Sequence, residues 1–134
     1  MYLVDTSVWI DFLRGRSAAH VDALKTLLEG EETVGVAPII LQEVLQGAES
    51  KERFEKWRMY FSELSCYVSK DPIATHVAAA RLYQQCRHKG KTPRSSNDCV
   101  IAQVAIEDAL VLLHNDRDFD VIAAVTSDLQ VFRP

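Results

Sequence analysis

Short apolar runs alternate along the chain with longer segments of helical periodicity. The runs are YLV at 2–4, TVGV at 33–36 and ALVLL at 109–113, and a helical pattern follows each of them. Apolar runs this short and continuous are typical of strands that are buried on both faces of a parallel sheet. Alternation of such strands with helices indicates βαβ units. The pattern therefore predicts an α/β fold around a central parallel sheet.

Two further strands and seven helices complete the predicted elements. LSCYV at 64–68 precedes Asp71 and Pro72, which suit a helix start, and a last short strand is predicted near 129–132. Helical patterns cover 7–14, 18–29, 38–46, 50–61, 71–89, 97–107 and 118–124. The 134 residues contain no long linker and no internal repeat, so we expect a single domain over 1–134.

The amino-acid composition limits which partners the protein can bind and in which cellular compartment it is expected. A net charge of -4 argues against a protein that coats nucleic acid through bulk charge, although a local basic rim stays compatible with it. Cys66, Cys86 and Cys99 lack the spacing of a zinc site or a disulfide framework, which fits a reducing compartment. The longest apolar runs fall far short of the ~20 residues of a membrane helix. We therefore expect a cytoplasmic protein that does not enter a membrane.

Acidic residues recur just beyond predicted strands, where open parallel sheets bind their ligands. Asp5 follows the first strand, and Asp116 follows the strand at 109–113. Glu43 lies on the border of the apolar face of the helix at 38–46. Taken alone, Asp5 would simply cap the next helix. Acids at several comparable positions favour a shared site instead.

Asp98 is the most informative of these acids. It shares the face of the helix at 97–107 whose positions i+3, i+4 and i+7 are apolar. A capping box with Ser95 would explain a carboxylate in the first turn, but not its place on the apolar face. An inward-facing carboxylate costs several kcal/mol unless it is paired, and its own helix offers no Lys or Arg within reach.

Convergence of these carboxylates would require a cation. Carboxylates that lie close together repel one another and raise one another's pKa, which destabilises the fold until a cation neutralises them. A ligand set of oxygen atoms without His or Cys selects a hard ion, and we expect Mg²⁺ with Mn²⁺ as a substitute. The predicted metal ligands are Asp5, Glu43, Asp98 and Asp116.

Four segments resemble the PIN-domain family of ribonucleases, and within it the VapC toxins of type II toxin-antitoxin (VapBC) pairs. They are LVDTSVWIDFLRG at 3–15, IILQEVLQGA at 39–48, SSNDCVIAQVAI at 95–106 and LLHNDRDFDVIA at 112–123. They occur in the family's order and span almost the whole chain. The resemblance implies a three-layer α/β/α domain with a central parallel sheet, a magnesium-dependent endoribonuclease activity and a cognate VapB-type antitoxin.

Carried over by position, the resemblance assigns roles to individual residues. The family's catalytic acids match Asp5, Glu43, Asp98 and Asp116, and Asp118 matches a fifth acid that some members use. Thr6 or Ser7 matches a small hydroxyl residue that supports the first acid. His114 departs from the family, which commonly has Thr or Ser there, and we interpret it as a strand-end histidine satisfied by backbone rather than as a catalytic base.

Partners follow from the same resemblance and from charge. RNA must approach an acidic site, so flanking cations should guide its backbone, and the candidates are Arg14, Arg16, Lys89, Lys91, Arg94 and Arg117. In the segment 50–64, Phe54, Trp57, Phe61 and Leu64 form an aromatic stripe that would either pack on the core or anchor an antitoxin helix. A homodimer is expected, with DNA contacted only through the antitoxin.

Other functional classes stay open at this point. A haloacid-dehalogenase-like phosphohydrolase also begins with a strand that ends in Asp, but it needs a second Asp where this chain has Ser7. A receiver or non-catalytic binding domain would place an acidic pair near the first strand. A PIN-type nuclease that is not a toxin fits the same motifs. Cleavage of RNA with Mg²⁺, compared with hydrolysis of a phosphomonoester, discriminates among these classes.

Overall fold

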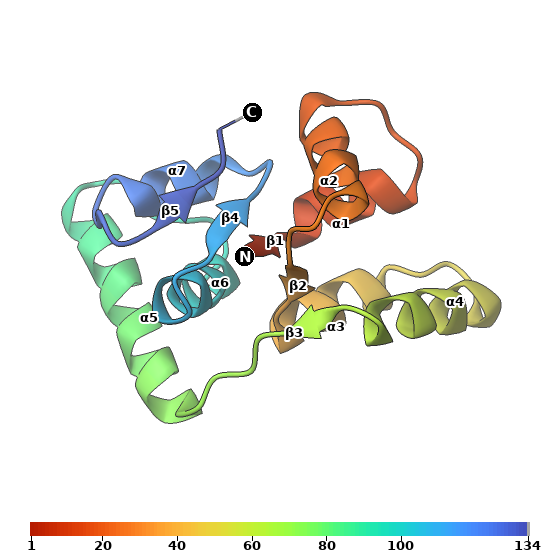
Figure 1. Cartoon of the computed structure of the whole chain (residues 1–134). Helices are drawn as coiled ribbons and strands as arrows, with labels where there is room; N and C mark the ends of the chain where they lie inside the picture. The colour runs from red at the N-terminus through yellow and green to blue at the C-terminus, as the bar shows by residue number, and fades with distance from the viewer. Residues whose placement is uncertain (134) are drawn as a thin grey trace.

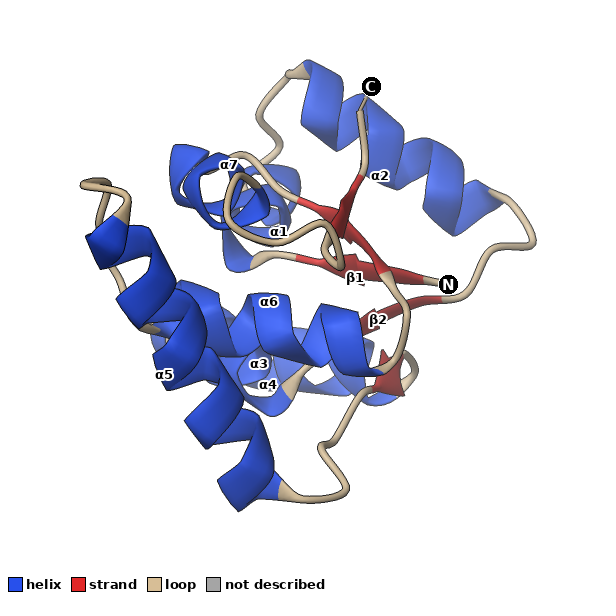
Figure 2. Cartoon of the chain, turned by 90° about the vertical axis from the view of Figure 1, so that its left-hand side faces the viewer, coloured by secondary structure: helices blue, strands red, loops and turns tan. Residues whose placement is uncertain are grey.

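A computed structural model describes residues 1–133, in which five parallel strands form one sheet (Figures 1 and 2). The strands are β1 (Tyr2–Val4), β2 (Val34–Val36), β3 (Ser65–Cys66), β4 (Val111–Leu113) and β5 (Gln130–Val131). The helices are α1 (Thr6–Leu13), α2 (Ala19–Glu29), α3 (Pro38–Gln46), α4 (Lys51–Ser62), α5 (Pro72–His88), α6 (Asn97–Glu107) and α7 (Arg117–Ala123). The predicted central parallel sheet is confirmed.

The strand order β3-β2-β1-β4-β5 puts β1 at the centre of the sheet. The chain runs from β1 outward through β2 to the edge strand β3, and it then crosses the sheet to β4, which lies on the other side of β1. Because Val4 pairs with Leu113, β1 and β4 end side by side, and the residues that follow them leave the sheet at the same edge. Such a switch point, at the carboxyl ends of parallel strands, is where open α/β sheets bind ligands.

The helices cover both faces of the sheet (Figure 1). Helices α1 to α4 pack on one another on one side, and α5 to α7 pack on one another on the other. This division follows from right-handed crossovers, because connections that run in opposite directions across a sheet must lie on opposite faces. The three-layer α/β/α architecture expected from the resemblance is therefore confirmed.

Trp9 on α1 anchors the α1 to α4 layer. Its side chain is fully buried, and its ring meets the ring of Phe61 edge-on with centroids 4.9 Å apart. Trp57 and Phe61 of the aromatic stripe are 8% and 3% exposed, so both face the core. Phe54 is 38% exposed. Of the two interpretations of this stripe, packing on the core describes Trp57 and Phe61.

The two strands that the sequence indicates only weakly are both present but short. β3 and β5 have two residues each, at the edges of the sheet. Asp71 caps α5 as expected, because its Oδ1 accepts a hydrogen bond from the Ala74 N–H at 3.1 Å. Among residues 1–133, every helix is too short or too polar to cross a membrane.

Candidate metal centre

Asp5 stands at the end of β1 and has two roles. As the N-cap of α1 it accepts hydrogen bonds from the backbone N–H of Ser7, at 3.0 Å, and from the Ser7 hydroxyl. The Ser7 Oγ in turn accepts the backbone N–H of Asn115 at 3.1 Å, which ties the end of β1 to the end of β4. Asp5 is 4% exposed, so capping and burial at the switch point occur together.

Asp116 and Asp118 enter the site from the start of α7. Asp116 is the N-cap of this helix, and its Oδ1 accepts the Asp118 N–H at 2.9 Å. Asp118 is 4% exposed although its side chain is a carboxyl group. One carboxylate oxygen from each of Asp98, Asp116 and Asp118 lies within 4.8 Å of the others. Asp118, matched above to an acid that only some relatives use, is therefore part of the central cluster.

Asp98 contributes the most unusual environment of the set. It is 7% exposed in the first turn of α6, and its Oδ2 is buried without a hydrogen-bond partner among the described residues. No side chain caps α6 at Ser96, so helix capping does not account for the carboxylate. Burial, followed by repulsion from Asp5 and the α7 acids, raises the pKa of Asp98 to about 8. Among the described residues, no Lys or Arg forms an ion pair with Asp98.

Asp5 couples the cluster to Glu43. Burial raises the pKa of Asp5 to about 6, against the hydrogen bonds from Ser7 and with a smaller contribution from the charge of Glu43. Glu43 is half-buried on α3, where its Oε1 accepts a hydrogen bond from the Thr6 hydroxyl at 2.8 Å. Thr6 and Ser7 therefore each hold one acid, and the two hydroxyl residues that the sequence left as alternatives both have a partner.

His114 supports the turn into α7. Its Nδ1 accepts the backbone N–H of Asp116 at 3.2 Å, so the neutral ring carries its proton on Nε2. Nε2 faces Asp120 at 3.8 Å, and burial lowers the pKa of the ring. These contacts agree with the interpretation of His114 as a histidine satisfied by backbone.

The candidate RNA-guiding cations differ in their surroundings. Arg94 pairs with Asp116 at 3.1 Å and Asp118 at 3.4 Å, so it reaches the acids directly. Arg16 is paired with Asp11 at 2.9 Å. The other four are exposed: Arg14, Lys89, Lys91 and Arg117. The contact of Arg94 was not predicted, because 22 and 24 residues separate it from its partners and no periodic pattern joins them.

The donor set fits a hard divalent cation. The available ligand atoms are carboxylate oxygens from the start of α6 and the start of α7, and a buried oxygen of Asp98 has no hydrogen-bond partner among the described residues. Mg²⁺ and Mn²⁺ prefer such oxygen ligands, and a bound cation would offset the burial and the repulsion that together raise the pKa of Asp98. Asp98, Asp116 and Asp118 each have an oxygen within reach of one ion, whereas Asp5 and Glu43 lie outside this group, and Asp5 acts on Asp98 through its charge.

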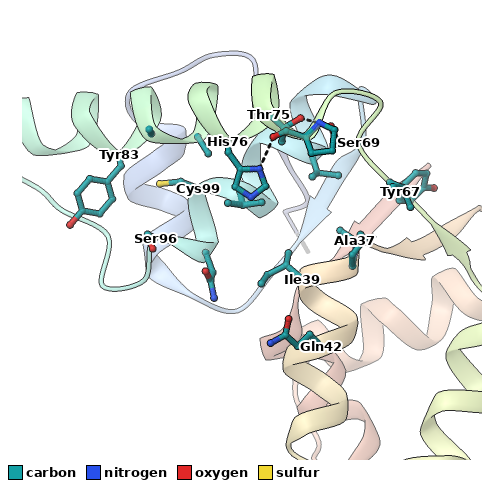
Figure 3. A pocket seen from close by; sticks show the side chains of 18 of the residues that line it. Ala37, Ile39, Gln42, Tyr67, Ser69, Thr75, His76, Tyr83, Ser96 and Cys99 are labelled. Atoms are coloured by element: carbon teal, nitrogen blue, oxygen red, sulfur yellow. Dashed lines mark hydrogen bonds between the residues drawn. The ribbon is translucent and has the colours of Figure 1, made fainter.

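A separate cavity of about 780 Å³ lies between α3, α5 and α6 (Figure 3). Its lining is largely apolar and includes Ile39, Ala79 and Tyr83. Cys99 lines this cavity although its neighbour Asp98 belongs to the acid cluster. The start of α6 therefore borders both the acid cluster and this cavity.

Comparisons by sequence and by structure match the chain to the same group of known proteins. The model of the PIN domain family matches residues 2–125. The VapC ribonuclease Mb1587 of Mycobacterium bovis and ribonuclease VapC11 of Mycobacterium tuberculosis are each 35% identical to the chain over 128 residues, which is 95% of both chains. The structure of VapBC2 from Rickettsia felis, bound to a promoter DNA fragment, aligns with a TM-score of 0.75 at 20% identity, over 98% of this chain and 96% of that one.

Proposed function

Because the chain belongs to the PIN-domain family, with VapC ribonucleases as relatives, we propose that it is the toxin of a type II toxin-antitoxin pair. Its activity is that of a magnesium-dependent endoribonuclease that hydrolyses RNA phosphodiester bonds. The observation that carries this proposal is the buried, unpartnered Oδ2 of Asp98 within an oxygen-only cluster at the switch point of the sheet. That arrangement costs stability unless the site binds a cation.

The chain's own residues divide the work. Asp5, Asp98 and Asp116 hold the ion, Asp118 completes the cluster, and Glu43 enters from α3. A bound Mg²⁺ supplies charge that activates water and polarises the phosphate. Ser7 fixes the carboxylate of Asp5, and Thr6 fixes that of Glu43, so both acids are oriented before the substrate arrives. Arg14, Arg16, Lys91, Arg94 and Arg117 are the cations proposed to guide the RNA backbone.

Incubation with structured RNA tests the activity. Purified protein should produce new RNA ends with Mg²⁺ or Mn²⁺ and none with EDTA, and sequencing of those ends identifies the RNA and the site. A generic phosphomonoester in parallel should stay intact. Hydrolysis of the monoester without RNA cleavage would favour the haloacid-dehalogenase-like alternative. Binding of metal with neither reaction would favour a non-catalytic domain.

The protein partner is a VapB-type antitoxin that lies beside the acid cluster. Helix α4 leaves Phe54 exposed on the same face as Trp57, next to a hollow lined by Ala48 and Lys51. A partner helix would bury Phe54 there, and a basic side chain from its tail would enter the cluster of acids. DNA would be contacted only through this antitoxin.

Phe54→Ala is therefore expected to weaken binding of the neighbouring gene product by roughly tenfold, since truncation of an aromatic anchor costs more than about 1 kcal/mol. RNA cleavage should be retained. Calorimetric titration measures the affinity, and Met59→Ala is the matched control because Met59 is 64% exposed on another face of α4. Equal affinities for the wild type and Phe54→Ala would move the antitoxin interface away from this helix.

A homodimer and a cytoplasmic location complete the proposal. Val68, which lines the 780 Å³ cavity, is 63% exposed, and Ile73 and Val77 on α5 are 79% and 47% exposed. A second copy of the chain would cover such apolar side chains. The thiols of Cys66, Cys86 and Cys99 are free, which suits a reducing compartment where RNA is present.

A further inference from the structure

Arg94 forms ion pairs with two acids of the cluster, which its role as an RNA-guiding cation does not by itself explain. Its Nη2 lies 3.1 Å from Asp116 Oδ1, and its Nε lies 3.4 Å from Asp118 Oδ1. Among residues 1–133, no other Lys or Arg side chain forms an ion pair with Asp5, Glu43, Asp98, Asp116 or Asp118. The single positive charge of the guanidinium is therefore shared between two of the acids that would bind metal.

The backbone of Arg94 is held independently of its side chain. Its N–H donates to Asp118 Oδ2 at 2.9 Å, and the preceding Pro93 is buried. The side chain, in contrast, is 62% exposed. An anchored backbone with an exposed, long side chain lets the guanidinium leave the carboxylates while its point of attachment stays beside the site.

We infer that Arg94 is an exchangeable counter-ion of the metal centre. In the metal-free protein its guanidinium pairs with Asp116 and Asp118, and a divalent cation must displace it to gain these oxygens. Once displaced, it remains tethered at the edge of the site, where it binds a phosphate of the RNA backbone. The inference rests on the proposed metal-dependent function.

Two physical arguments support the exchange. Arginine and a divalent metal ion both bind carboxylate oxygens, so two cations cannot share Asp116 Oδ1 without repulsion. The planar guanidinium also matches the geometry of a phosphate, so Arg94 can bind a phosphate beside the acids after its release. By contrast Arg117, which adjoins Asp116 in sequence, is exposed and has no ion pair among the described residues.

Titration with Mn²⁺ alone tests the competition. Arg94→Gln should bind Mn²⁺ about threefold more tightly or better, because the competing cation is gone while the backbone N–H to Asp118 is retained. Arg117→Gln removes the same charge next to the site, and it should change the Mn²⁺ affinity by less than about 1.5-fold. Electron paramagnetic resonance of free Mn²⁺ gives the dissociation constants, and a melting curve in EDTA confirms folding.

The substrate arm uses the metal-saturated protein. Arg94→Gln should raise the KM for RNA with a smaller change in kcat, and Arg94→Lys should restore part of the loss because it keeps the charge but not the fork. Equal Mn²⁺ affinities for wild type and Arg94→Gln would overturn the inference, as would equal gains in the Arg94 and Arg117 variants. Absence of Mn²⁺ binding to the wild type would instead overturn the metal centre itself.

Discussion

Asp98→Asn is expected to abolish RNA cleavage while it stabilises the metal-free protein. Loss of a ligand removes several kcal/mol of metal-dependent stabilisation of the transition state, which corresponds to about a thousandfold in rate. The same substitution replaces a buried, unpaired carboxylate with a neutral amide of the same shape. At pH 8 the metal-free variant should gain roughly 2 kcal/mol in its free energy of unfolding. Initial rates of RNA cleavage and urea unfolding in EDTA measure the two effects.

The pH dependence gives this prediction a second readout. The pKa of Asp98 rises from 3.8 to about 8 on folding, so between these values the folded state binds more protons than the unfolded state. Stability of the metal-free wild type is therefore greatest at the acidic end of this window and falls as the pH rises through it. Asp5, with a pKa of about 6, adds to the fall in the lower part. Asp98→Asn should remove its part of the fall over the whole window, so the fall that remains comes from Asp5 and ends near pH 6.

The effect of Mn²⁺ on the melting temperature provides a further test of the same variant. Mn²⁺ binds only the assembled acids, so it should raise the melting temperature of the wild type in proportion to the logarithm of its concentration above the dissociation constant. Asp98→Asn should lose most of this gain. Asp22→Asn, on the first turn of α2, removes an exposed carboxylate outside the cluster and should keep it. Wild-type cleavage by folded Asp98→Asn would show that Asp98 is not part of the catalytic site.

The sheet could be predicted because its strands are buried on both faces. YLV, VGV and VLL have no polar side to present to water, so their continuous apolar character identifies them without any information on tertiary contacts. β3 and β5 lie at the edges and have two residues each, too few to generate a pattern of their own. Their existence depends on the pairing that β2 and β4 offer, which is a property of the folded sheet.

Prediction of the site depended on local sequence signals. Asp5 and Asp116 follow strands, and Asp98 lies on an apolar helical face. Each of these acids can therefore be recognised from the few residues around it. Arg94 does not, because its ion pairs join a loop to α7 across more than twenty positions. The burial of Asp118 could not be predicted from the sequence either. An acid in the first turn of a helix is ordinarily exposed to solvent and is stabilised there by the helix dipole.

The inward packing of α4 leads to the largest expected effect on stability. Trp57→Ala and Phe61→Ala should each lower the free energy of unfolding by about 3 to 5 kcal/mol, because each leaves a cavity in the packed hydrophobic core. Phe61 contacts both Trp9, at 4.9 Å between ring centroids, and Tyr60, at 5.4 Å. Met59→Ala, on the exposed side of the same helix, should change stability by less than about 0.5 kcal/mol.

Equilibrium unfolding in urea, followed by tryptophan fluorescence, measures these differences, with circular dichroism as the probe for the variant that lacks Trp57. This loss of stability would lower antitoxin binding and RNA cleavage together, through the fraction of folded protein, whereas Phe54→Ala should affect binding alone. A loss below about 1 kcal/mol in both Trp57→Ala and Phe61→Ala would contradict core packing of this stripe. Those two side chains would then be available to a partner, as exposed aromatic anchors on α4.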